Sequence, residues 1–437
     1  MSTTAPPKAN KAERLLVPAT FITNLGNGIQ LTAASYLVFT AQNTMLAVSW
    51  LMIAVTIPQV ALSVYFGKLV DRFDRRTLAV TSDLVSGVAA IGLPLWLALG
   101  GEPSTVSYVA SFILSISAAL FFPASNALIK ERIPEARLAK FNGNSEVAIQ
   151  AGSLASAALG GWVIVWTGVD ALFYFNSATF FVSALMMFAI GRRPAGSAAS
   201  AAATAAKAAA ATAKASGPRP PLARLALLYA IGNIVIITGN SIMLVLVIDA
   251  FHSNTGYLGI VDALFGIGAL AAPWTFGKLS AKSGLVKTAL IGYLVWAVIL
   301  VTESLHLYAM MAAIPFAGIT FCVARIAART ALMKAAPEER TGFVFGATNA
   351  FGLAAGTAAV TGISLLVDAT KVQYGFYALS ALVVVVATAT VLALPKSFLA
   401  APAAEAEPAE PAVTPAPAAD TASDAEAEVL VAAAAKA

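Results

Sequence analysis

The sequence is poor in the residues from which metal sites and disulfide frameworks are built. It has a single cysteine, Cys322, and two histidines, His252 and His306, in 437 residues. One cysteine excludes a disulfide framework, and two histidines leave little for a histidine-rich metal site, so we expect no metal and no cofactor. Only 11% of the residues are charged, against about 25% in a soluble domain. Because 59% are hydrophobic and the mean hydropathy is +0.81, the sequence predicts an integral membrane protein.

Signatures of catalysis are also missing. No nucleotide-binding P-loop occurs, and no Ser-His-Asp or metal constellation emerges from the spacing of the residues. We therefore expect that the protein is not an enzyme and does not itself hydrolyse ATP. The net charge of +5 comes from bases gathered in the loops of one side, so we expect no nucleic-acid partner.

Long apolar runs are what the sequence has in abundance. We count twelve that are long enough to cross a bilayer, which needs about 20 apolar residues. Helices are expected, because lipid cannot satisfy open backbone groups and the alternation of a barrel strand is absent. The predicted spans are 16–40, 45–66, 78–99, 104–129, 141–166, 171–191, 222–250, 256–277, 284–302, 307–333, 342–367 and 373–394.

The basic residues predict the orientation of these spans. If both termini and the even-numbered loops share one side, all but three of the 27 lysines and arginines fall on that side. The exceptions are Lys371 on the other side and Arg325 and Arg329 inside segment ten. Because basic loops stay in the cytoplasm, the sequence predicts a multi-pass protein of the inner (plasma) membrane with both termini cytoplasmic.

Composition divides the chain into five parts. Residues 1–15 form a cytoplasmic N-terminal segment, 16–191 a first six-helix bundle and 222–394 a second one. Between the bundles, 192–221 is a basic, alanine-rich cytoplasmic linker. From 395 to 437 the chain is an acidic Ala/Pro tail that cannot bury a core, so we expect disorder there.

Internal repetition supports two sister halves. The repeated strings are FGKL at 66–69 and 276–279, ALIK and ALMK at 127–130 and 331–334, and Gly-Asn at 26–27 and 239–240. Three landmarks in the same order at similar offsets indicate two six-helix units of common origin.

The stretch 67–76, GKLVDRFDRR, lies between segments two and three, where we predict a tight basic turn at the cytoplasmic surface. It resembles the loop 2–3 signature of the major facilitator superfamily, G-x-L-x-D-R-x-x-R-R. The resemblance implies an all-α membrane protein with twelve transmembrane helices in two pseudo-symmetric six-helix bundles and a binding site between them at mid-depth. It also implies a cytoplasmic gate formed by Gly67, Asp71, Arg72, Arg75 and Arg76.

In that gate, Asp71 would face the N-terminus of segment eleven, and the three arginines would pair with acids on neighbouring helix ends. The alternative is that the arginines serve only as topology anchors.

Segment five carries a second resemblance. Its glycines fit the spacing of the antiporter motif of drug exporters, although Ser156-Ala157 stands where that family has Gly-Pro. The glycines concerned are Gly143, Gly152, Gly160 and Gly161. Together with the 67–76 motif, they make the chain similar to the drug and siderophore exporter branch, which includes macrolide-efflux and enterobactin-exporter proteins. Close helix packing alone is the equal alternative for these glycines.

Ionisable residues inside a bilayer are functional candidates. Asp262, six residues into segment eight, is the proton-coupling candidate; the alternative is a carboxylate that is paired with a neighbour or hydrated by the outer vestibule. Arg325 could bind an anionic substrate group or neutralise Asp262, whereas Arg329 is close enough to the cytoplasmic end to snorkel. Asp83 and Glu146 lie five or six residues past the cytoplasmic starts of segments three and five. Because the helix dipole and nearby loop arginines stabilise a carboxylate there, we interpret both as gate or structural charges and not as proton carriers.

Amide side chains are the other candidates for contact with a substrate. Segment one carries Asn24, Asn27 and Gln30, and segment seven carries Asn240. The first helix of each half lines the cavity in the resembled family, so these amides are expected substrate contacts; interhelical hydrogen bonds are the equal alternative. An apolar interior with few charges would suit a bulky amphipathic or lipophilic solute.

These observations predict a secondary active transporter that works as a monomer in the lipid bilayer. We expect proton-coupled efflux of small amphipathic or lipophilic compounds, such as drugs or siderophore-like metabolites, by alternating access. Small-molecule substrates and protons are the expected partners. A lipid or lysophospholipid flippase of the same fold, and a uniporter without proton coupling, remain the alternatives.

Overall fold

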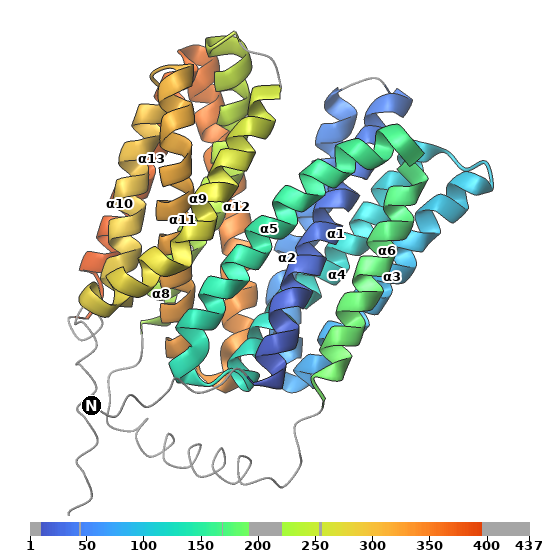
Figure 1. Cartoon of the computed structure of the whole chain (residues 1–437), viewed down its shortest axis with the longest axis horizontal. Coiled ribbons are helices and arrows are strands. Elements are labelled where there is room, and N and C mark those ends of the chain that lie inside the picture. The colour runs from blue at the N-terminus through green and yellow to red at the C-terminus, as the bar shows by residue number, and fades with distance from the viewer. Residues whose placement is uncertain (1–9, 43–44, 168, 192–220, 253–255, 396–437) are drawn as a thin grey trace, which may run out of the picture. The chain divides into compact units, whose positions relative to one another are not determined.

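The computed structural model describes residues 10–42, 45–167, 169–191, 221–252 and 256–395, all within one contact unit, Met1–Ala401. Nearly all of the predicted linker and of the predicted acidic tail lies outside the described residues. Twelve α-helices occupy the described part (Figure 1). They are α1 (Lys11–Gln42), α2 (Met45–Arg72), α3 (Arg75–Ala98), α4 (Pro103–Arg132), α5 (Glu135–Thr167), α6 (Val169–Ala189), α8 (Leu222–Val245), α9 (Gly256–Ser283), α10 (Leu285–Glu303), α11 (Leu307–Ala335), α12 (Thr341–Ala369) and α13 (Val372–Leu392).

The helices form two groups of six, α1 to α6 and α8 to α13 (Figure 1), as the apolar runs predict. Ten of them, among the described residues, are long and apolar enough to cross a membrane. The two outside that set are α1 and α5. The helix α1 is long enough to cross a membrane, but the amides Asn24, Asn27 and Gln30 lower its mean hydropathy.

The predicted turn at 67–76 is mostly helix, which corrects the sequence-based expectation. The helix α2 continues to Arg72, α3 begins at Arg75, and only Phe73 and Asp74 lie between them. Asp74 caps α3 by accepting a hydrogen bond from the Thr77 backbone N–H at 3.1 Å. An apolar run marks where lipid ends, but a helix continues into the cytoplasm as long as its backbone groups remain paired.

The seventh predicted span, 222–250, divides into two parts. The helix α8 ends at Val245 and continues as a π-helical turn, Leu246–Ala250, in which the Phe251 N–H donates to the Leu246 carbonyl at 3.0 Å.

Contacts between the two groups follow the internal repeat. The helix α2 packs along α12, and α5 packs along α9. Since α2 corresponds to α9 and α5 to α12 in the repeated halves, these two contacts are equivalent. The two bundles therefore meet through a pair of pseudo-symmetric helix crossings, as expected for parallel repeats.

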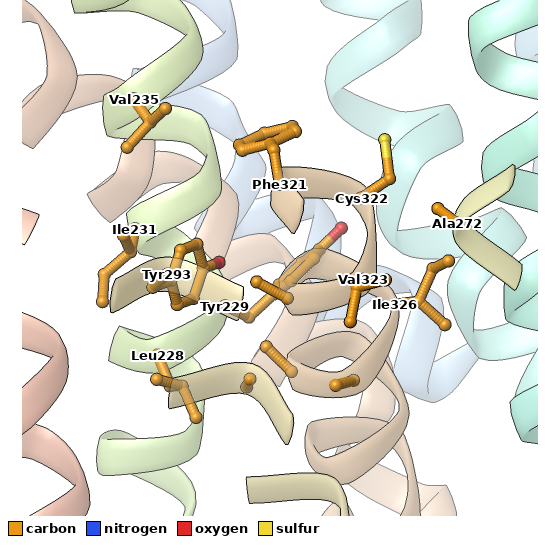
Figure 2. Close-up of a cluster of buried hydrophobic side chains, with 14 of the residues drawn as sticks. Leu228, Tyr229, Ile231, Val235, Ala272, Tyr293, Phe321, Cys322, Val323 and Ile326 are labelled. Atoms are coloured by element: carbon orange, nitrogen blue, oxygen red, sulfur yellow. The ribbon is translucent and has the colours of Figure 1, made fainter. Parts of the chain in front are cut away.

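The second bundle has the larger apolar core. Tyr229, Tyr293 and Phe321 gather where α8, α10 and α11 meet (Figure 2), and the rings of Trp296 and Phe321 have centroids 6.0 Å apart. Tyr293 is fully buried. This packing fixes the rotation of α11 about its axis, and with it the direction in which the arginines of α11 point.

The α1–α5 contact requires a glycine at position 152. A Cβ atom on Gly152 would lie 2.6 Å from the Phe21 carbonyl oxygen and 3.1 Å from the Asn24 Cβ, whereas one on Gly92 would meet nothing within 4 Å. Gly152→Ala should therefore destabilise the fold by about 1–3 kcal/mol, as overpacking does. Thermal unfolding of the purified protein measures this. The matched control, Gly92→Ala, should unfold at or above the wild-type temperature, and an unchanged midpoint for Gly152→Ala would contradict the close α1–α5 approach.

Candidate functional site

A cavity of about 450 Å³ lies between the helices of the two bundles. Every helix of the first bundle contributes to its wall, and α8, α11 and α12 contribute from the second. The volume falls within the roughly 300–1,000 Å³ of small-molecule sites. The cavity is thus large enough for a small organic compound and is built mainly by the first bundle.

The wall of this cavity is more polar than the apolar composition of the chain predicts. Hydroxyl and amide side chains line much of it, with Phe121, Phe122 and Phe180 among the apolar residues. The polar lining comprises Thr20, Thr23, Asn24, Asn27, Gln30, Gln59, Ser86, Ser111, Ser115, Ser125, Asn126, Asn233 and Asn349. Polar side chains that lipid would exclude thus collect where the helices face each other, within a wall whose surface is still largely apolar, in line with the expected interior.

The structure brings four of the five predicted substrate contacts to the cavity. Asn24, Asn27, Gln30 and Arg325 line it, whereas Asn240 is exposed at a position outside the lining. Gln30 accepts a hydrogen bond from the Asn176 Nδ2 at 2.8 Å, and its own Nε2 is buried without an acceptor in the described part of the chain.

Asn233 of α8 occupies the place that the sequence assigned to Asn240. Gly232-Asn233 is a second Gly-Asn pair in α8, and its offset from Gly26-Asn27 is 206 residues (233 minus 27). That offset lies between those of the other repeated strings, 204 (331 minus 127) and 210 (276 minus 66). The repeat alone does not select Asn233, because the starts of α1 and α8 are 211 residues apart (222 minus 11), which is nearer to the 213 (239 minus 26) of the 239–240 match.

A buried ion pair joins the two bundles at the cavity. The Arg325 Nε lies 3.6 Å from the Glu146 Oε2, and the Gln150 Nε2 donates to the other oxygen of Glu146 at 3.2 Å. Glu146 is 2% exposed. Two predictions are therefore wrong: Arg325 does not neutralise Asp262, and the partner of Glu146 comes from α11 of the other bundle and not from a loop arginine.

Asp83 is a second buried carboxylate, and it lines the cavity from α3. It accepts a hydrogen bond from the Ser183 hydroxyl at 2.6 Å and is 2% exposed. No basic side chain forms an ion pair with it in the described part of the chain. The sequence predicts that Asp83 lies close to the cytoplasmic end of its helix. It lies further along the helix than expected, because α3 begins at Arg75 and not at residue 78.

Asp262 lies apart from these groups. It is exposed on α9 and is not among the residues that line the cavity, and no ion pair involves it within the described ranges. Its assignment as the proton-coupling group stays a prediction.

Asp71 binds the start of α12. Its Oδ1 accepts from the Gly342 N–H at 2.8 Å, and its Oδ2 accepts from the Phe343 N–H at 2.9 Å. A carboxylate suits this position, because the first N–H groups of a helix lack partners within the helix and carry partial positive charge. This is the contact with segment eleven that the resemblance implied.

The three arginines of the motif behave differently from one another. Arg75 pairs across the bundles with Glu338 at 3.5 Å and also with Glu131 at 3.4 Å. Arg76 donates to the carbonyl oxygens of Met187 and Phe188 at the end of α6, so the expected acidic partner is wrong for it. Arg72 is exposed and forms no ion pair within the described residues.

Two further hydrogen bonds join the two bundles, and the residues of one of them, Arg329 and Asn126, line the cavity. Arg329 donates to the Asn126 Oδ1 at 2.8 Å, and Asn142 donates to the Thr330 hydroxyl at 3.0 Å. Both bonds link the first bundle to α11. Arg329 is 8% exposed, so the expectation that it snorkels to the surface is wrong.

Two of the four predicted packing glycines of segment five, Gly143 and Gly152, lie where α5 contacts a neighbouring helix. A Cβ on Gly143 would lie 3.2 Å from the Pro273 Cβ of α9, and Gly152 lies against α1. The surroundings of Gly160 and Gly161 lie outside what the structure describes. Among the described residues, no three His, Cys, Asp or Glu side chains converge to hold a metal.

This fold and this cavity define a multi-pass membrane protein with a solute-sized chamber between two helical bundles. The sequence model of the Major Facilitator Superfamily matches this chain over residues 16–247 and 226–430. The chain belongs to this superfamily, whose members transport small molecules across membranes.

Curated relatives match only part of the chain. It is 29% identical over 182 residues to the uncharacterized MFS-type transporter YfiS of Bacillus subtilis, covering 40% of this chain and 42% of the relative. It is 27% identical over 188 residues to the multidrug efflux pump Tap of Mycobacterium tuberculosis, covering 42% of this chain and 45% of the relative. The chain thus spans less than half the length of the curated relatives it matches.

Solved structures share the fold over most of the chain. A bacterial homologue of the iron transporter ferroportin in an outward-facing state gives a TM-score of 0.71 at 15% identity, covering 87% of this chain and 98% of that one. The proton:xylose symporter XylE gives a TM-score of 0.71 at 14% identity, covering 88% and 95%. At such identities the likeness shows the twelve-helix fold alone.

The hydrogen bonds of Asp71 make a prediction about the start of α12. Asp71→Asn keeps the shape but removes the charge, and a hydrogen bond to a charged group contributes roughly 1.5–3 kcal/mol. Hydrogen–deuterium exchange followed by mass spectrometry should show faster exchange at residues 341–345 in this variant, by about tenfold or more. Asp368→Asn, an exposed change near the other end of α12, should leave that region unchanged. Equal exchange in the Asp71 variant would mean that its carboxylate does not hold α12.

Proposed function

We propose that the chain is a secondary active exporter of small amphipathic compounds that works by alternating access. The observation that carries the proposal is the combination of a cavity between the bundles with a closed layer of contacts at one end of it. Asp71 with α12, Arg75 with Glu338, and Asn142 with Thr330 form that layer. A chamber closed at one end by breakable polar contacts supports a two-state transporter.

The closed end is the cytoplasmic end in our proposal, because it coincides with the basic helix ends. The conformation is then outward-facing, and Gly67, Asp71 and Arg75 act as the cytoplasmic gate. In this proposal Arg76 stabilises the gate indirectly, by fastening α3 to α6 through the Phe188 carbonyl.

The proposed direction of transport, out of the cell, follows from the relatives. The relatives that carry a functional name are multidrug efflux pumps, at 26–27% identity over less than half of their length. The mixed wall of the cavity, with phenylalanines beside amides and hydroxyls, supports an amphipathic solute.

A transport assay tests the proposal. The full chain, reconstituted into liposomes, should move a fluorescent amphipathic dye against its gradient when a pH gradient is imposed, and Asp71→Asn should lose this flux while still inserting into the membrane. Headgroup translocation of a labelled phospholipid without dye transport would instead favour a flippase. Absence of both would refute the proposal.

Thiol labelling tests the orientation. Phe73 lies between α2 and α3 and is 60% exposed, and Leu99 lies between α3 and α4 and is 88% exposed. In intact cells a membrane-impermeant maleimide should label Leu99→Cys but not Phe73→Cys, and permeabilisation should make Phe73→Cys reactive. The native Cys322 is buried, so the wild-type chain should give little background. Labelling of Phe73→Cys from outside would reverse the topology.

Proton coupling has two candidate carboxylates, Asp262 from the sequence and Asp83 from the cavity. We favour Asp83 as the group that exchanges a proton with the water of the cavity, because it lines that space and no basic residue pairs with it within the described ranges. Asp83→Asn should therefore flatten the pH dependence of dye transport, and Asp262→Asn should leave it unchanged. The reverse result would return the role to Asp262, and two unchanged profiles would exclude both.

A further inference from the structure

Two arginines of α11 face the cavity from the same side of the helix. Arg325 and Arg329 are four residues apart, so they lie one turn apart on a shared face, and both line the cavity. Their side chains are largely buried, with Arg325 13% exposed and Arg329 as a residue 8% exposed. Charged groups at such depth in a membrane protein need partners.

The carboxylates supplied by the chain do not match these two cations. Glu146 pairs with Arg325 through one contact of 3.6 Å, longer than the roughly 2.7–2.9 Å of a strong charge-assisted bond. Arg329 forms no ion pair with an acid within the described residues and donates only to the neutral amide of Asn126. Within the described ranges, Arg329 therefore lacks a counter-charge, and Arg325 has one at a long distance.

Two buried N–H donors without an acceptor also lie beside the cavity. The Arg329 Nε and the Gln30 Nε2 are buried and have no acceptor in the described part of the chain. Both residues line the cavity, Gln30 from α1 and Arg329 from α11. Because buried N–H groups are almost always paired in folded proteins, these two donors mark places beside the cavity where the described part of the chain supplies no acceptor.

We propose that the transported solute is an amphipathic organic carboxylate whose anionic oxygens bind Arg325 and Arg329 and displace Glu146 from Arg325. This inference rests on the proposed export function and assigns its substrate class. The planar fork of arginine matches a carboxylate with two parallel hydrogen bonds. Phe121, Phe122 and Phe180, on the wall formed by α4 and α6, receive the apolar body of the solute.

Glu146 is suited to act as the competitor for Arg325. Its Oε1 accepts from Gln150 at 3.2 Å, while the pair with Arg325 uses only Oε2. When the solute takes Arg325, Glu146 retains the hydrogen bond from Gln150. The solute and Glu146 therefore compete for one cation, and removing the charge of Glu146 must strengthen binding of the anion.

The experiment measures binding of two fluorescent probes that differ only in charge. Dansylglycine carries a carboxylate, and dansylglycinamide is its neutral amide. The purified full chain in lipid nanodiscs should bind dansylglycine more tightly. Arg325→Gln should weaken that binding by roughly tenfold or more, as loss of a charge-assisted bond does, and Glu146→Gln should tighten it. Neither variant should change binding of the amide.

Two further variants guard against misfolding and unspecific charge effects. Arg325→Gln alone leaves Glu146 buried without its cation, so the double variant with Glu146→Gln removes both charges together and should abolish the preference for the anion. Lys282→Gln, an exposed loss of positive charge at the end of α9, should leave both affinities unchanged.

The outcomes separate this inference from the proposed function. If the chain exports dye but binds both probes equally, or binds neither, the carboxylate site is refuted and export stands. Weaker dansylglycine binding in Glu146→Gln also refutes the competition. If the carboxylate preference holds but no solute is moved in liposomes, the anion site stands and the export proposal fails.

Discussion

The contact between α2 and α12 is the constraint on which the closed end of the molecule depends. A Cβ on Gly67 would lie 2.6 Å from the Gly342 carbonyl oxygen, and one on Gly342 would lie 2.6 Å from the Gly67 carbonyl oxygen. Glycine on both helices therefore allows the two backbones to touch. Only at that separation can the carboxylate of Asp71 reach two successive N–H groups of α12. The motif thus specifies a backbone distance and the side chain that uses it.

Polar side chains explain the rest of the arrangement. Lipid offers no hydrogen bonds, so the amides of α1 and the hydroxyls of α4 must face either one another or water held inside the protein. Their convergence produces a wall of mixed polarity in a chain that is otherwise very hydrophobic. The same rule places the Glu146–Arg325 pair between the bundles, where each charge meets the other and not lipid.

The sequence was sufficient for the parts that depend on periodicity and on local patterns. The twelve spans, the two halves and the meeting of Asp71 with the start of α12 all follow from apolar length, repetition and one motif. The partners of Arg325, Arg76 and Arg329 did not follow. Each depends on the rotation of a helix about its axis and on which helix of the other bundle lies opposite, and a run of apolar residues determines neither. Asn233 is a similar case, because its amide lies in the predicted span but no local pattern distinguished it from Asn240.

The two equivalent crossings are held unequally. The α2–α12 crossing carries the carboxylate of Asp71, whereas the α5–α9 crossing has Gly143 against Pro273 and Leu154 against Gly266, which are apolar contacts. Opening the α2–α12 crossing therefore requires the loss of two hydrogen bonds to a carboxylate, whereas the contacts that must separate at the α5–α9 crossing are apolar. The two crossings are equivalent by the repeat but unequal in the free energy needed to open them, so a rocking motion of one bundle against the other would not be symmetric.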